Sequence, residues 1–363
     1  MDMDVKSLTW MQMSKNAMAK WAFQIRYTCT SSEGGEARHA YIGLAAAAGE
    51  GSWQIESKGY QFWVQTDSSG EFIINNVIPG TYSLHGWASG FIGDYYDKGP
   101  ITISSGSTKE LGNLTYIPPR HGPTQWEIGF PDQTAVGSYV PDPNPLYVNK
   151  LYLHSTEKYR QYGLWDRYTD MHPTSDQVYM VGASDCKRDW FFAHVYRRAA
   201  DKRCYPSTWQ IRFNLGAVIS GVYKLRLSIA SATPAYLQVR VNDQNESQPL
   251  FGISGVGGDN TIARHGIHGV YRLFSIDVIS SLLVEGDNTI FLTLAKGGDE
   301  FLGVLYDYVR LESPWTSERP QWCITGIDHI QDDCPSKLFS WQTQIKDPHD
   351  SHWLRSLCTI FYS

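Results

Sequence analysis

The sequence has no long hydrophobic run. A helix that spans a bilayer needs about 18 or more apolar residues in succession, and the apolar part of Gly43–Gly49 is far shorter. The first 25 residues carry several charges, among them Asp2 and Lys6, and lack the apolar core of a signal peptide. We therefore expect no membrane partner, and either an intracellular protein or a start that is not the native secretory start.

Cysteine and charge are also scarce. Six cysteines in 363 residues are too few for a disulfide-stapled miniprotein, and no Cys-X-X-Cys motif is present to form a zinc ribbon. Charged residues make up 19% of the chain, and 31 Lys and Arg against 37 Asp and Glu give a net charge of −6. A mildly acidic chain is not expected to bind nucleic acid or anionic membranes.

Several catalytic motifs are absent as well. There is no Gly-X-Ser-X-Gly elbow in a strand–turn–helix setting, no P-loop, and no Gly-X-Gly-X-X-Gly before a helix. The glycine-rich Gly255–Gly258 is followed by Asp259 and Asn260, which is typical of a flexible loop rather than a phosphate cradle. These absences argue against nucleophilic hydrolysis and nucleotide binding.

Aromatic residues, by contrast, are abundant. They form 13% of the chain, with 13 Trp and 22 Tyr, alongside 32 Gly and 17 Pro. This composition is typical of a turn-rich β protein, and an apolar content of 42% argues against disorder over most of the chain.

Residues 38–118 have the pattern of a small all-β sandwich. Turns at Asp67–Gly70 and Pro79-Gly80 separate short alternating segments. The predicted strands are Ala40–Ala46, Tyr60–Gln65, Glu71–Asn75, Thr81–Ala88, Ile101–Ile103 and Leu111–Tyr116. Residues 1–37 are expected to be irregular, although Lys6–Ile25 could form a helix without a cap.

The proline-rich Pro118–Pro123 predicts a domain boundary, and residues 119–314 have the pattern of a jelly roll. Tyr159–Asp170 is a candidate short helix. The predicted strands are Val178–Gly182, Trp190–Tyr196, Thr208–Leu215, Gly221–Ala230, Tyr236–Asn242, Tyr271–Asp277, Asn288–Leu294 and Gly303–Leu311. Residues 315–363 show no sustained periodicity and are expected to be an atypical tail.

The segment Ala263–Gly269 is the richest in chemistry. Arg264, His265 and His268 could offer a guanidinium and two imidazoles to an acidic sugar, because the arginine fork suits a planar carboxylate. The alternatives are a structural loop before the strand at Tyr271, and a metal site, for which no third ligand lies nearby in sequence.

A second cluster, Ser184–Trp190, could hold a polar sugar while Trp190 stacks on its face. The alternative is a charged turn before a buried aromatic strand. The choice between sugar contact and a core position also stays open for Trp126, Tyr162 and Trp165. Trp and Tyr often lie in cores, where they bury a large area.

A series of longer motifs extends from about Arg38 to Pro314, which is about three-quarters of the chain. In the first domain they are Tyr60–Trp63, Asp67–Phe72, Asn75–Tyr82 and Gly90–Tyr95. In the second they are Trp126–Gly129, Tyr139–Pro145, Arg160–Trp165, Asp189–Phe192, Leu237–Asp243, Ile262–Gly269, Leu282–Gly286 and Tyr306–Tyr308. Together they resemble the middle and C-terminal domains of plant rhamnogalacturonan lyases, polysaccharide lyase family 4.

The resemblance implies a fold and a reaction. The small domain would be a fibronectin-III-like or prealbumin-like sandwich, and the large one a galactose-binding-like jelly roll similar to carbohydrate-binding modules. The family reaction is eliminative cleavage of rhamnose–galacturonate bonds in pectic rhamnogalacturonan I, which needs a base and cationic groups. The family's catalytic lysine and histidine belong to an N-terminal domain without a counterpart here, so we assign no catalytic residue and expect a truncated form.

Our main interpretation is a rhamnogalacturonan-binding remnant of a lyase, with sugar contacts at Trp190, Arg264, His265 and His268. The partner would be rhamnogalacturonan I and the protein a monomer, secreted to the cell wall according to the resemblance. No cofactor is expected, and a structural calcium ion stays open. Two alternatives remain: an active lyase with His265 or His268 as base and Arg264 as carboxylate clamp, and a structural remnant that binds nothing.

Overall fold

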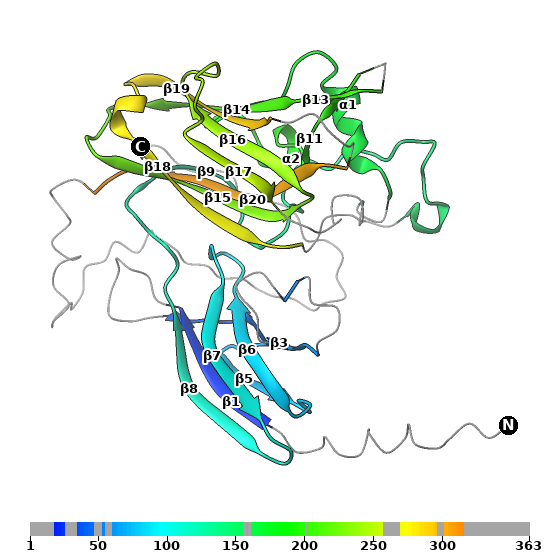
Figure 1. The fold of residues 1–363 in the computed structure, drawn as a ribbon, viewed down its shortest axis with the longest axis vertical. Coiled ribbons are helices and arrows are strands. Elements are labelled where there is room, and N and C mark those ends of the chain that lie inside the picture. Colours follow the sequence, from blue (N-terminus) through cyan, green and yellow to red (C-terminus); the bar gives the residue numbers. More distant parts are fainter. Residues whose placement is uncertain are drawn as a thin grey trace.

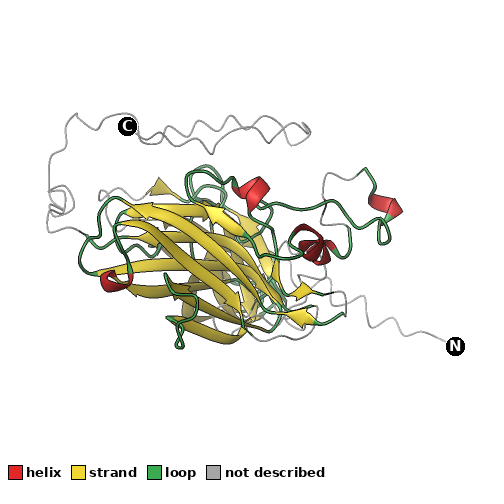
Figure 2. Ribbon diagram, turned by 90° about the horizontal axis from the view of Figure 1, so that it is seen from above, coloured by secondary structure: helices red, strands yellow, loops and turns green. Residues whose placement is uncertain are grey.

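The computed structural model describes residues 18–25, 35–46, 53–54, 60–154, 158, 161–199, 202–256, 269–295 and 301–315. Strands dominate this part of the chain, as the sequence predicts, and they form a smaller and a larger sandwich (Figure 1). Viewed from above, the few helical turns lie at the margins of the strand layers (Figure 2).

The smaller sandwich consists of two four-stranded sheets. One has the order β4-β3-β6-β7, formed by Phe62–Gln65, Tyr41–Ala46, Gly80–Trp87 and Tyr95–Ile103. The other contains β2, β1, β5 and β8, formed by Gly35–Glu36, Met18–Ile25, Glu71–Asn75 and Thr108–Tyr116. Alternate residues of β5, Phe72 and Ile74, face a buried core that also holds Ile42, Leu44 and Leu84.

The strand β1 corrects the expectation that residues 1–37 are irregular. Met18–Ile25 pairs antiparallel with β5 and parallel with β8, so its backbone supplies ladder hydrogen bonds to both neighbours. Trp21, Phe23 and Ile25 fall at every second position of this segment, which is strand periodicity. Without β1, both neighbours would present unpaired edges.

The larger sandwich is a jelly roll of two five-stranded sheets. The first has the order β10-β14-β19-β16-β17, formed by Val178–Met180, Ser207–Leu215, Gly286–Leu294, Ala235–Val241 and Phe251–Val256. The second has the order β11-β20-β15-β18 with β9 also paired to β20, formed by His194–Val195, Gly303–Glu312, Val222–Ala232, Arg272–Ile279 and Thr124–Gly129.

Burial along the strands explains why these segments were recognisable. In β14 the buried residues alternate at Trp209, Ile211, Phe213 and Leu215, as expected for a strand with one face on the core. Every residue of β20 is buried. Outside its sheet, Arg310 of this strand contacts Pro119 in the linker, and Asp307 contacts the loop at Asp132 and Gln133. The prediction of a strand over Trp190–Tyr196 holds only for His194–Val195, while β9 and β17 were not predicted.

Short helical elements lie outside the sheets. They are η3 (Lys150–Tyr152), η5 (Leu164–Asp166), α1 (Arg167–Met171), α2 (Cys186–Asp189) and η6 (Ser280–Leu282). A two-stranded hairpin, β12 (Arg197–Arg198) with β13 (Cys204–Tyr205), projects beside α1. The candidate helix at Tyr159–Asp170 thus corresponds to η5 and α1.

A loop of the smaller sandwich docks against the jelly roll. The N–H of Gly90 donates to the carbonyl of Pro131 at 2.8 Å, and the N–H of Gly93 donates to the Tyr271 hydroxyl at 2.9 Å. Gly93 has φ +88°, and a Cβ there would lie 2.1 Å from the Tyr116 hydroxyl oxygen. The positive φ strains any other residue, and a side chain here would also displace the Tyr116 hydroxyl of β8, so glycine suits this position.

Beneath this loop, Asp307 ties three segments together. Its Oδ1 accepts the N–H groups of Asp132 and Gln133 at 2.9 and 2.8 Å, and its Oδ2 accepts the Ser228 hydroxyl at 2.7 Å. Ser228 in turn bonds to Tyr271 at 2.8 Å. Asp307 is 5% exposed, so these hydrogen bonds replace the water that its carboxyl group has lost.

The linker after β8 is fastened to the jelly roll by a buried charge cluster. Glu312, which is fully buried, accepts the N–H of His121 at 3.0 Å and Arg226 Nε at 3.1 Å. Arg310 pairs with the same carboxylate at 2.5 Å and donates to the carbonyl of Pro119 at 3.3 Å. The two domains are therefore connected at the linker and again at the docked loop.

Candidate functional site

The residues that the sequence analysis proposed as sugar contacts divide into two groups. Arg264, His265 and His268 lie outside the residues that the structure describes, so their assignment stays a prediction. Trp190 lies within them.

Trp190 belongs to the core of the jelly roll. Its side chain is 2% exposed, and it meets Trp209 and Tyr179 edge-on at centroid distances of 5.0 and 5.6 Å. The prediction that Trp190 stacks on a sugar is wrong, because burial leaves no face of the indole open to a ligand. The alternative was a charged turn before a buried aromatic strand. The turn is present as α2, capped by Asp185, which accepts the N–H of Lys187 at 2.8 Å. The aromatic residues after it are buried, but the strand begins only at His194.

The structure instead shows an open pocket beside η5 and α1. These two elements form a helical turn with two faces. Leu164, Trp165 and Tyr168 are buried against the core. The opposite face carries Asp166 together with Thr169 and Asp170, which follow it by three and four residues. These three side chains line the pocket.

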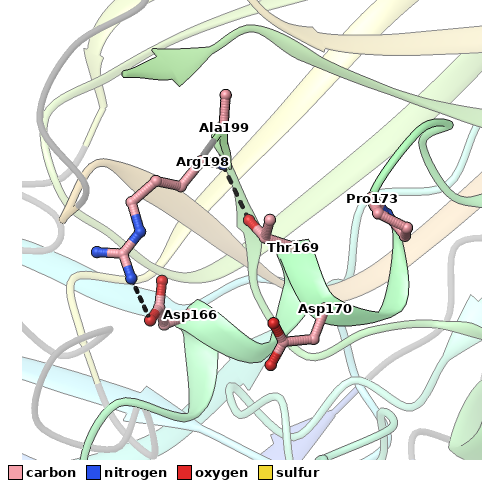
Figure 3. Close-up of a pocket in the computed structure, with 6 residues that line it drawn as sticks. All are labelled: Asp166, Thr169, Asp170, Pro173, Arg198 and Ala199. Carbon is pink, nitrogen blue, oxygen red and sulfur yellow. Dashed lines mark hydrogen bonds and ion pairs between the residues drawn. The ribbon is translucent and has the colours of Figure 1, made fainter. Parts of the chain in front are cut away.

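The hairpin β12–β13 supplies the other wall of the pocket (Figure 3). Arg198 donates a guanidinium N–H to Asp166 Oδ2 at 2.7 Å, and its backbone N–H to the Thr169 hydroxyl oxygen at 2.9 Å. Pro173 and Ala199 complete the lining, around a volume of about 480 Å³. The two bonds from Arg198 hold the hairpin to the helical turn, so both walls of the pocket are positioned together.

A second ion pair lies next to the pocket and supports the same hairpin. Arg197, the neighbour of Arg198, donates to Asp176 Oδ1 at 2.7 Å, and Asp176 Oδ2 accepts the N–H of Thr208 on β14 at 2.7 Å. The Tyr168 hydroxyl also donates to Asp176, at 3.1 Å. This network anchors the pocket to β14 of the first jelly-roll sheet.

Burial favours the neutral forms of two titratable groups near the pocket, Tyr168 and His172. Burial, with the nearby charge of Asp176 as a smaller cause, raises the pKa of Tyr168 well above its ordinary value. Burial lowers the pKa of His172, which packs against the Tyr168 ring at a centroid distance of 4.7 Å. The charge at the pocket therefore comes from its aspartates and arginines.

Exposed aromatic and aliphatic side chains precede this turn in sequence. Tyr162 is 47% exposed and meets Trp165 edge-on at 5.2 Å. Tyr147 is 51% exposed, and a Cβ at Gly163 would lie 3.7 Å from its ring. Leu146, Leu151 and Leu153 are exposed on the same segment. Of these side chains, Tyr162 is the nearest in sequence to Asp166 and offers a flat apolar face.

The pocket has the groups that bind polyhydroxy compounds. Carboxylate oxygens accept hydrogen bonds from hydroxyl groups, and guanidinium and hydroxyl groups donate them. Tyr162, which precedes η5 and is not part of the lining, could add apolar contact through its ring. In the part of the chain that the structure describes, no three His, Cys, Asp or Glu side chains gather as metal ligands would. The arrangement fits recognition of a sugar.

Sequence reasoning did not find this pocket. The spacing of Asp166, Thr169 and Asp170 within a predicted helix was an available signal for a polar face. Arg198, however, lies about 30 residues further along, and only the fold places it opposite Asp166.

The described residues contain no helix that is long and apolar enough to cross a membrane. Two sandwiches and an open polar pocket define the class: an all-β protein whose larger domain has a carbohydrate-binding-module-like fold. Residues 37–111 match the family model of polysaccharide lyase family 4, domain II, and residues 124–311 match that of domain III. The chain therefore belongs to polysaccharide lyase family 4.

Two relatives of this chain are named rhamnogalacturonate lyases, and one similar solved structure is a carbohydrate binding module. The chain is 28% identical over 290 residues to the rhamnogalacturonate lyase of Dickeya dadantii, covering 77% of this chain and 43% of that protein. It is 27% identical over 291 residues to rhamnogalacturonate lyase B of Emericella nidulans, covering 70% and 42%. A family 35 carbohydrate binding module from an environmental isolate is similar at 14% identity and a TM-score of 0.19, over 32% of this chain and 71% of the module. The chain spans less than half the length of the two lyases.

Proposed function

We propose that this chain binds pectic rhamnogalacturonan I through its jelly-roll domain, as the domain II and III portion of a rhamnogalacturonan endolyase. The observation that carries the proposal is the match to domains II and III in the family order. The relatives named as rhamnogalacturonate lyases indicate the polymer. Binding takes place at the cell wall, outside the cell, and the protein acts as a monomer.

The geometry supports binding at the pocket and the neighbouring tyrosines. Asp166, Asp170 and Arg198 can exchange hydrogen bonds with sugar hydroxyls at the open surface. Tyr162, held edge-on by Trp165, can stack on an adjacent sugar of the chain.

Affinity electrophoresis tests the proposal. Migration of the full chain is compared in native gels with and without debranched rhamnogalacturonan I. We expect retardation, and a Tyr162→Ala variant is expected to lose at least half of it, because a stacked sugar ring contributes about 1 kcal/mol or more. Tyr60→Ala is the matched control, since Tyr60 is 61% exposed on the smaller sandwich. Unretarded migration of the folded wild-type protein would refute the proposal.

The lyase names of the relatives favour a second candidate function, eliminative cleavage by this chain itself. It is tested by following the ultraviolet absorbance of the unsaturated uronate that β-elimination creates. A steady rise that disappears in His265→Ala and His268→Ala variants would support it, and a flat trace with folded protein would refute it.

A further inference from the structure

The charges that line the pocket are not those expected for a uronate. Two carboxylates, Asp166 and Asp170, stand against a single guanidinium, Arg198. Arg198 is already paired with Asp166 at 2.7 Å. Arg167, which follows Asp166 in sequence and is not part of the lining, is paired with Asp170 at 2.7 Å. A carboxylate group entering the pocket would therefore find the arginine on its lining already committed to an aspartate, with no further cation there to pair with.

The hydrogen-bonding groups point to hydroxyls as the ligand. Asp170 is 56% exposed, and its Oδ2 accepts Arg167 while Oδ1 has no donor within the described part of the chain. Thr169 Oγ1 accepts the backbone N–H of Arg198, which leaves the hydroxyl proton available to donate. A ligand that both donates to carboxylates and accepts from a hydroxyl matches this set.

The remaining lining is apolar. Pro173, which follows α1, contributes a ring, and Ala199 contributes a methyl group from the hairpin. Rhamnose, a 6-deoxyhexose, carries a methyl group where galacturonate carries its carboxylate. Either apolar group can contact the methyl group of the first sugar, and neither offers a partner to the carboxylate of the second.

We propose that this pocket binds the neutral rhamnose residues of the rhamnogalacturonan backbone and rejects galacturonate. Asp166 and Asp170 accept the sugar hydroxyls, Thr169 donates to one, and the C6 methyl group packs on Pro173 and Ala199. The inference rests on the proposed function and specifies which sugar of the polymer is recognised.

Calorimetric titration of the full chain tests the inference with three probes. These are rhamnogalacturonan oligosaccharides, oligogalacturonides of equal length, and free L-rhamnose as a competitor. We expect the first to bind at least tenfold more tightly than the second, and rhamnose to displace them. Raising the salt concentration should leave the affinity almost unchanged, because the recognised sugar is uncharged.

Two variants separate the possible outcomes. Asp170→Asn, at an exposed side chain, should weaken rhamnogalacturonan binding about tenfold, because it removes a charged hydrogen-bond acceptor. Ala199→Leu should abolish competition by rhamnose, because the larger side chain would occupy the space in which the methyl group of the sugar packs. Asp277→Asn, an exposed ion-paired aspartate on β18, is the matched control and should change nothing.

Equal affinity for oligogalacturonides, or unchanged binding in both pocket variants, would overturn the inference while leaving the proposed function intact. Absence of binding to either oligosaccharide would overturn both. Circular dichroism of each variant establishes that the fold is retained.

Discussion

Replacing Asp307 by asparagine is expected to remove a large pH dependence of stability. Asp307 lies beneath the docked loop with 5% of its surface exposed. Its carboxyl group accepts two backbone N–H groups and the Ser228 hydroxyl, which favours the ionised form. Burial is the larger effect and raises the pKa of Asp307 from 3.8 to about 7.

The direction of the pH effect follows from proton binding. Between pH 3.8 and about 7 the folded protein holds a proton on Asp307 that the unfolded chain has released. The free energy of unfolding therefore falls as the pH rises, by about 1.4 kcal/mol per pH unit. Across the whole window the loss amounts to about 4 kcal/mol, and the stability from this group is fully present only below the unfolded pKa.

Urea unfolding followed by tryptophan fluorescence measures this effect. Wild-type protein and the Asp307→Asn variant are compared at several pH values between about 4 and 7. Asparagine keeps an oxygen that can accept the N–H groups of Asp132 and Gln133, but it does not ionise. The stability of the wild type relative to the variant should fall by about 1.4 kcal/mol per pH unit.

The control is Asp277→Asn. The Asp277 side chain is 59% exposed, so its replacement should leave the pH dependence of the unfolding free energy unchanged. A wild-type-minus-variant difference that stays constant from about pH 4 to 7 would refute the argument. It would mean that the three hydrogen bonds compensate for burial and keep the carboxyl group ionised throughout.

Two further predictions concern buried side chains. Trp190→Ala should destabilise the jelly roll by about 3–5 kcal/mol in urea unfolding and leave the rhamnogalacturonan affinity of the folded fraction unchanged. Lost affinity without lost stability would contradict the core position of Trp190. Glu312→Gln should cost about 3–5 kcal/mol, because Arg226 and Arg310 would remain buried without their counter-ion, and high salt should not reduce this cost. A loss below about 1 kcal/mol would show that the cluster is not effectively buried.

Local pattern predicted most of the sheets, and its failures have identifiable causes. Strands such as β14 and β16 alternate apolar and polar residues because one face lies on the core. The strand β9 was missed because only six residues separate Pro123 from Phe130, which is too short a segment for its alternation to stand out. The strand β1 was missed because Lys6–Ile25 was assigned to a possible helix, and its partners β5 and β8 lie far away in the sequence, where no local pattern reveals them.

The site was harder to predict than the fold. An exposed Trp and a buried Trp have the same sequence signal, so Trp190 was assigned a ligand role that its burial excludes. The pocket depends on Arg198 meeting Asp166, a contact between a hairpin and a helical turn that no local pattern encodes. The assignment of Arg264, His265 and His268 remains a prediction.

The double connection between the domains has a mechanical consequence. A single linker would act as a hinge, but Gly93 held by Tyr271 and the linker held by Glu312 brace the joint from two sides. Rotation of one sandwich against the other would have to break the hydrogen bonds at both places, so the two attachments together restrict bending between the domains.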